Sequence, residues 1–183
     1  VAIDDIINEG IVVGEKKSPV KIVLDRSKCS DKIKDLIHEE FRNLLRVMQF
    51  ETKGTDIFRR WYVDGKIFFH LIIDDANPQK GILELRYIDP MNIQKIREYT
   101  KETLKNGTKI ITGFQDFYLY NKDNPRAGGN PSGIKISEDA IAFCSSGLMD
   151  SRYKRTVGFL HKSIKPLNQL RMLEDAIVIY RIS

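Results

Sequence analysis

The chain has 183 residues, of which 42% are hydrophobic and 30% charged, and its formal net charge is +5. This composition predicts a globular protein with a core and argues against disorder. No apolar run approaches the roughly 18 residues of a membrane-spanning helix, and the mild basic excess permits contact with nucleic acid without requiring it.

The first fourteen residues carry acidic side chains and no basic segment, so no signal peptide is expected. The sequence begins with Val rather than Met, and we therefore expect it to be a piece of a longer chain. The two cysteines, Cys29 and Cys144, lie far apart, and without a secretory signal they are expected to be reduced thiols rather than a disulfide.

Helices are predicted to dominate the first third of the chain. Residues 2–10 have the pattern of a helix that ends at Gly10, and two short β-type runs at 11–14 and 20–24 follow, joined by a turn at 14–19. Residues 31–49, after an N-cap at Ser30, form the clearest amphipathic helix. A shorter helix is expected at 55–62, closed by Asp64 and Gly65.

From Lys66 the hydrophobic pattern changes to that of strands. A continuous apolar run and an alternating run, separated by a turn at 74–81, predict an antiparallel pair. The complete set of expected strands is 67–73, 82–88, 92–100, 109–111, 114–120 and 140–144, with a loop at 121–133. The charge density of 92–100 would also allow a helix there. A helical turn at 156–163 leads into a last helix, so the order of elements predicts the α+β class with a mostly antiparallel sheet.

No pattern in the sequence predicts a catalytic, metal or cofactor site. The three histidines, His38, His70 and His161, lack metal-ligand spacing, and Asp74-Asp75 is better explained by a turn than by a magnesium site. No Gly-x-Ser-x-Gly motif surrounds Cys144–Gly147, no phosphate-binding loop is present, and the glycine pair at 128–129 lacks a flanking strand and helix.

Arg59 and Arg60 stand beside Trp61 and Tyr62, and such mixtures of cations and aromatics occur in proteins that bind single strands. Trp61 lies at helical spacing from apolar neighbours, which favours a core anchor, and the arginines are better explained as ion-pair or interface residues. Nucleic-acid binding by Arg59 and Arg60 is kept as the weaker hypothesis.

The last helix, expected over 166–183 with Pro166 in its first turn, is unusual because apolar residues lie on almost every side of it. The charged residues Arg171, Glu174, Asp175 and Arg181 gather on one side, but Leu167, Val178 and Ile182 lie among them. This apolar band is wider than a surface helix needs. One side is expected to pack on the body of the chain, and the other requires either the rest of a larger protein or copies of the same helix.

Several segments, in order along nearly the whole chain, resemble the portal (head–tail connector) proteins of T-even-like contractile-tailed bacteriophages. The segments are FRRWYVD at 58–64, IFFH at 67–70, ELRYIDP at 84–90, GFLHK at 158–162, KP at 165–166, NQL at 168–170 and LEDAIVIYRI at 173–182. Residues 121–133 do not take part in the resemblance.

The resemblance implies a structural subunit without catalysis or cofactors, part of a dodecameric ring at the portal vertex of the virion. Such rings nucleate procapsid assembly and form the channel for double-stranded DNA during packaging and ejection. Their implied partners are the major capsid and scaffold proteins, the large subunit of the terminase motor, and the neck and tail proteins. Assembly is expected in the bacterial host cell, with the inner side of its membrane as one candidate location.

By the order of the resemblance, residues 1–156 correspond to the portal wing and residues 157–183 to the start of the stem, whose first helix begins near 166. The clip, the second stem helix, the tunnel loop and the crown are expected to lie outside this piece, and the motor docks at the clip. The implied subunit-interface or channel residues are Leu170, Arg171, Leu173, Glu174, Asp175, Ile177, Val178, Tyr180 and Arg181.

Two hypotheses about function therefore stand side by side. In the first, the charged residues of the last helix lie at subunit seams, where a buried charge needs a partner of opposite sign, or face a channel, where acids discourage DNA from sticking. In the second, the chain is a sequence-independent nucleic-acid-binding module or an accessory nuclease that uses Arg59, Arg60, Asp74 and Asp75.

Overall fold

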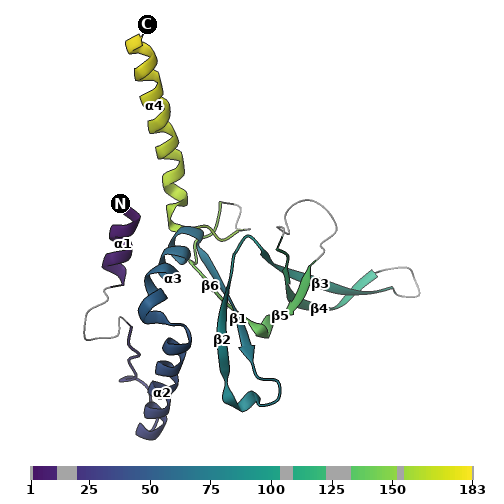
Figure 1. Ribbon diagram of the computed structural model, residues 1–183. Coiled ribbons are helices and arrows are strands. Elements are labelled where there is room, and N and C mark those ends of the chain that lie inside the picture. The colour runs from purple at the N-terminus through teal and green to yellow at the C-terminus, as the bar shows by residue number, and fades with distance from the viewer. Residues whose placement is uncertain (1, 12–19, 104–108, 123–132, 152–154, 183) are drawn as a thin grey trace.

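The computed structural model describes residues 2–11, 20–103, 109–122, 133–151 and 155–182 (Figure 1). Three helices come first, six strands follow, and one long helix ends the described chain. The helices are α1 (Ala2–Gly10), α2 (Asp31–Val47), α3 (Phe50–Asp64) and α4 (Ile164–Ile182); the strands are β1 (Lys66–Ile73), β2 (Ile82–Ile88), β3 (Ile93–Thr103), β4 (Lys109–Tyr120), β5 (Ile134–Ser137) and β6 (Ile141–Ser145). Short 3₁₀ turns are η1 (Pro78–Lys80), η2 (Glu138–Ala140) and η3 (Phe159–Ser163). The predicted α+β class is confirmed.

The strands form two antiparallel three-stranded sheets rather than one. The first sheet has the order β2-β1-β6, and the second has the order β3-β4-β5. The core lies between them, where Phe68, Ile88 and Ile141 of the first sheet meet Ile93 and Tyr118 of the second. The rings of Phe68 and Tyr118 meet edge to face with centroids 5.9 Å apart, so this contact joins the sheets.

Strand β1 is apolar on both faces because it is covered on both faces. Phe68 points into the core between the sheets, whereas Ile67, Phe69 and Leu71 face the side on which α3 packs. A strand covered on both faces is expected to be a continuous apolar run rather than an alternating one. The prediction of a strand at 67–73 with its antiparallel partner at 82–88 is confirmed.

The predicted helices are confirmed with shifted ends. The helix at 31–49 ends at Val47, and Ser30 occupies its N-cap position without a side-chain capping bond. The helix expected at 55–62 begins earlier, at Phe50, because Gln49 turns the chain with a left-handed φ of 51° and separates it from α2. Gly65 ends α3 in the left-handed region with φ of 72°, as the Asp64-Gly65 pair predicted.

Two strand predictions were wrong. Residues 20–24 belong to no strand, although their composition is β-like, because no neighbouring strand offers them hydrogen bonds in the described part of the chain. Residues 109–111 and 114–120 form the single strand β4. Gly113 does not break it; the pairing with β3 shifts by one residue there, and Thr112 is the extra residue of a bulge.

One strand, β5, was missed, since only four residues form it and its pairing with β4 is what orders them. The predicted turn at 14–19 and most of the predicted strand at 11–14 lie outside the described residues, as do the glycine pair at 128–129 and most of the loop at 121–133. The helical turn expected at 156–163 is the shorter η3.

The amphipathic pattern of α2 predicts a buried apolar face, and the structure covers this face only in part. Ile33 and Leu36 are about half exposed or more, and no residue of α2 is fully buried. The helix packs with α3 and β2, mainly through its C-terminal half.

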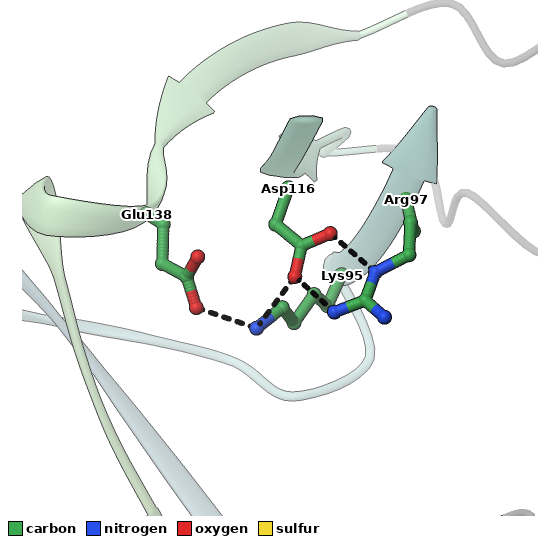
Figure 2. Close-up of polar contacts among 4 residues, drawn as sticks. All are labelled: Lys95, Arg97, Asp116 and Glu138. Atoms are coloured by element: carbon green, nitrogen blue, oxygen red, sulfur yellow. Dashed lines mark hydrogen bonds and ion pairs between the residues drawn. The ribbon is translucent and has the colours of Figure 1, made fainter. Parts of the chain in front are cut away.

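A charged cluster ties the second sheet to the connection that leads into β6 (Figure 2). Arg97 Nε and Nη2 donate to the two carboxylate oxygens of Asp116 across the β3–β4 pair, both at 2.7 Å. Lys95 Nζ lies 3.4 Å from Asp116 and 2.5 Å from Glu138 of η2. The hydrogen bonds from Arg97 hold the pKa of Asp116 at about 2, below its usual 3.8.

Loss of the Asp116 carboxylate is expected to lower stability in a pH-dependent way. A lowered pKa in the folded state means that ionised Asp116 stabilises the fold fully above pH 3.8, and that this contribution disappears as the pH falls toward about 2. The melting temperature of Asp116→Asn should therefore lie a few degrees below that of the wild type at pH 7, and the gap should close between pH 4 and pH 2. Asp75→Asn, which changes an exposed turn carboxylate, is the control. A gap that does not depend on pH would contradict the assignment.

Candidate assembly interface

Helix α4 projects from the body of the molecule like a stalk (Figure 1). It begins at Ile164, two residues before the predicted start at Pro166. Its principal contact with the rest of the described chain is η3, the 3₁₀ turn that precedes it. The expectation that one side of α4 packs on the body is wrong, because every described residue from Ile164 to Ile182 is exposed.

The exposed surface of α4 is strongly apolar. Its large hydrophobic side chains are between 51% exposed, at Ile164, and 83% exposed, at Tyr180. They surround the helix, since successive residues advance about 100°. The whole chain exposes 15,038 Å² of surface, whereas a compact monomer of 21.1 kDa exposes about 9,000 Å². An apolar helix of this kind is stable in water only when other surfaces cover it.

All nine predicted interface or channel residues lie on α4 and are exposed: Leu170, Arg171, Leu173, Glu174, Asp175, Ile177, Val178, Tyr180 and Arg181. The spacing of Arg171 with Glu174 and Asp175 suits ion pairs within the helix, but neither pair forms in the described chain. The charges of α4 therefore remain available for groups outside this chain.

Aromatic rings anchor the base of the stalk. Phe159 of η3 stacks on Tyr62 of α3 with centroids 5.0 Å apart and planes 8° from parallel, and it also meets Trp61 at 5.1 Å. The indole nitrogen of Trp61 is buried and has no hydrogen-bond partner among the described residues. Trp61 thus anchors α3 against η3, and the sequence alone did not predict that Phe159 would be its partner.

Two glycines allow the backbone to pass closely at this anchor. A Cβ on Gly158 would lie 2.0 Å from the carbonyl oxygen of Val63, and one on Gly65 would lie 2.3 Å from that of Val157. Ser146 fixes the same segment, since its hydroxyl donates to the carbonyl of Val157 at 2.8 Å and its N–H donates to that of Gly65 at 2.7 Å. The end of α3 and the start of η3 are held together through backbone contacts, which determine the direction in which α4 leaves the body.

The two arginines that could contact nucleic acid both form ion pairs within the chain. Arg59 lies 3.1 Å from Asp4 of α1, and Arg60 lies 2.9 Å from Asp56 on its own helix. The guanidinium of Arg60 also lies over the ring of Tyr87, and its interaction with this side chain raises the pKa of Arg60. These contacts join α1, α3 and β2, and the two arginines do not form a shared surface with α4.

The other candidate residues have local roles. Asp74 accepts a hydrogen bond from the N–H of Ala76 at 3.0 Å and pairs with Lys80 at 3.3 Å, as expected of a turn acid. Cys29 and Cys144 are free thiols, and both are exposed. Across the described ranges, no three His, Cys, Asp or Glu side chains come close enough to hold a metal ion. None of the described helices combines the length and the apolar character needed to cross a membrane.

Comparison with known proteins gives a match over the full chain. The family model described as bacteriophage T4-like portal protein (Gp20) matches residues 1–183. The portal protein of Vibrio phage KVP40 is 38% identical over 193 aligned residues, which cover 100% of this chain and 37% of that protein. The portal protein of Salmonella phage ViI is 30% identical over 195 residues, covering 100% and 35% respectively. The chain spans little more than a third of the length of these curated relatives.

Removal of the Phe159 ring is expected to loosen the anchor of the stalk. Trp61 is the single tryptophan of the chain, so tryptophan fluorescence reports on the surroundings of this one side chain. Phe159→Ala should shift the Trp61 emission to longer wavelength, because water reaches the indole, and should cost roughly 2 kcal/mol of unfolding free energy. Ile134→Ala, which removes an exposed apolar side chain on β5, should leave the emission unchanged. An unshifted spectrum for Phe159→Ala would rule out the anchor.

Proposed function

Because the chain belongs to the family of bacteriophage T4-like portal proteins, we propose that it forms part of a portal subunit and that α4 is the element through which its copies assemble. The proposed role is structural: the ring is a component of the virion at the portal vertex and forms the channel for packaging and ejecting DNA. The observation that carries the proposal is a folded body from which an apolar helix projects with no cover of its own.

Within this proposal, residues 1–156 belong to the wing and residues 157–183 begin the stem. The change from body to stalk near Gly158 and Phe159 supports this division. The relatives are nearly three times as long as this chain, and the clip, second stem helix, tunnel loop and crown would belong to the remaining length. Docking of the terminase would then occur outside the residues described here.

A ring explains why α4 is apolar on more than one side. A helix at the edge of a single domain needs one apolar face, whereas a helix in a ring has a neighbour on each flank. Leu170, Leu173 and Ile177 lie along one broad sector, and Val178 and Ile182 lie on the opposite side. Packing against two neighbouring copies would remove both groups from water.

A ring would also explain the charged residues of α4. Charges buried at a seam are tolerated only when paired, and Arg171 with Glu174 and Asp175 offers both signs for pairing between copies. Acidic groups that face the channel would instead repel the phosphates of double-stranded DNA and let it slide. Capsid and scaffold proteins, terminase, and neck and tail proteins complete the set of proposed partners.

The alternative, a nucleic-acid-binding module or an accessory nuclease, gains no support from the geometry. Arg59 and Arg60 are engaged with Asp4 and Asp56, and Asp74 is engaged in its turn. No observation in the described part of the chain favours this second function over the first.

The assembly role of α4 is tested by imaging the complete protein from which this chain derives. Negative-stain electron microscopy should show twelvefold rings for the wild type. Leu173→Glu should give monomers, because an acid in place of a buried leucine meets no partner of opposite charge and costs several kcal/mol at every seam. Leu83→Glu, at a similarly exposed leucine on β2, is the matched control and should still give rings. Intact rings in Leu173→Glu would exclude α4 from the interface.

Reversal of the charge at Glu174 separates a seam from a channel position. If Glu174 lies at a seam, Glu174→Lys breaks the pairing, and ring yield should fall severalfold. If Glu174 faces the channel, rings should form normally but package DNA more slowly, most markedly at low salt, where lysine binds phosphate best. The two measurements are ring counts by microscopy and DNA packaged per procapsid. Normal values for both would remove Glu174 from the proposed interface and channel.

A further inference from the structure

A second exposed apolar surface lies on a β-hairpin arm. Residues 98–103 of β3 and 109–115 of β4 extend beyond the part of β4 that pairs with β5, and they run clear of the body (Figure 1); these residues are called the arm. The side chains of Tyr99, Ile111 and Phe114 in the arm are 50%, 60% and 63% exposed. Three large apolar groups on one short hairpin form a patch that favours a contact.

The bulge in β4 brings these three side chains to the same face. Tyr99 pairs directly with Phe114, and after the bulge at Thr112 it is Ile111 that pairs with Lys101. Residues directly opposite in an antiparallel pair share a face, and so do residues two apart on one strand. Without the extra residue Thr112, Ile111 would lie on the other face from Phe114. The bulge therefore makes one apolar patch out of side chains that would otherwise be divided.

The patch continues the face that forms the core. Along β4, Phe114 shares its face with Asp116 and Tyr118, and Tyr118 packs against Phe68 between the two sheets. Near the body this face is covered by the first sheet. In the arm, the guanidinium of Arg97 lies over the ring of Phe114, 4.5 Å from its centroid, but Tyr99, Ile111 and Phe114 remain at least half exposed. The arm thus presents a core-like face at a distance from the core.

A groove that is apolar, like the patch on the arm, lies between the helices and the first sheet. It has a volume of about 510 Å³, and the described residues that line it are all apolar. They come from α2, α3 and all three strands of the first sheet, and include Leu44, Phe58, Trp61, Phe69, Leu85 and Cys144. A space of this size holds a few side chains rather than a whole helix.

The arm and the groove lie on opposite sides of the molecule. In Figure 1 the arm extends away from the first sheet on one side, and α2 and α3 lie on the other. One copy therefore cannot place its arm in its own groove. A protruding patch on one side and a receiving groove on the other are the two halves of a head-to-tail contact, and head-to-tail contacts form a ring when the rotation between successive copies closes.

We propose that the Tyr99–Ile111–Phe114 patch of the arm packs into the groove of the next copy of this chain. This inference rests on the proposed ring assembly and adds to it a contact separate from α4. Charge permits the contact: the described arm carries Glu98 and Glu102 against Lys101 and Lys109, so it has no net charge, and the groove lining carries none. The contact can therefore form although each copy carries a formal charge of +5.

Cross-linking between two variants of the 183-residue chain tests the proposal. The groove variant is Cys29→Ser, which keeps the free and exposed Cys144 of the groove. The arm variant carries Cys29→Ser, Cys144→Ser and Ile111→Cys. Mixed at high concentration with a short bismaleimide, which tolerates small differences in register, the two should give a covalent dimer severalfold more abundant than either variant gives alone. A matched control replaces Ile111→Cys with Leu83→Cys, at an exposed leucine outside the groove lining.

Addition of Phe114→Asp to the arm variant should reduce the mixed dimer to the level of the Leu83→Cys control, while an unchanged far-ultraviolet circular dichroism spectrum shows that the body remains folded. A mixed dimer no more abundant than this control would overturn the arm contact, and rings of the complete protein would then leave the α4 assembly intact. A strong mixed dimer without rings would have the opposite meaning: the arm contact holds and the proposed ring fails. Absence of both would overturn both.

Discussion

The structure depends on burying strand β1 on both faces. Phe68 packs against Tyr118 and joins the first sheet to the second, whereas Ile67 and Phe69 face the helical side, where α3 packs. Several elements are attached through this strand: β2 and β6 pair with it directly, α3 leads into it through the left-handed Gly65, and η3 is stacked on α3. The direction of α4 is therefore determined by a chain of contacts that begins in the core, although α4 itself contributes nothing to that core.

The elements that could be predicted from the sequence are those in which the order of apolar and polar residues shows which sides of the element are buried. Strands β1 and β2 have an apolar run and an alternation, and α2 has a 3.6-residue period, so local sequence was sufficient. The failures occurred where structure depends on distant partners. Residues 20–24 are β-like but belong to no strand in the described part of the chain, and β5 is too short to be recognised without the edge of β4 that orders it. Gly113 suggested a break, whereas the pairing with β3 continues past a bulge.

The candidate interface shows the same division. The presence of apolar residues on all sides of α4 can be predicted from its sequence, because helical spacing alone determines the direction of each side chain around the helix axis. The anchor at its base was not predictable in this way, since Phe159 and Tyr62 are nearly a hundred positions apart and meet only after Gly158 lets the backbone pass close to Val63. A glycine followed by an aromatic residue just before a helix is the local signal that such an anchor leaves.

The distribution of uncovered apolar surface indicates how copies of the chain can assemble. A protein that dimerises through one patch places its apolar surface on one side, because the same patch meets itself. Among the described residues, uncovered apolar surfaces point in different directions: α4 along the stalk, the arm to one side, and the groove on the other. Surfaces on opposite sides cannot meet in an isolated pair without leaving one arm and one groove unused. Each copy added to an open row covers one arm or one groove and brings a new uncovered one. Only a closed ring leaves no arm and no groove uncovered. The uncovered surfaces of the single chain are therefore those that the proposed ring would cover.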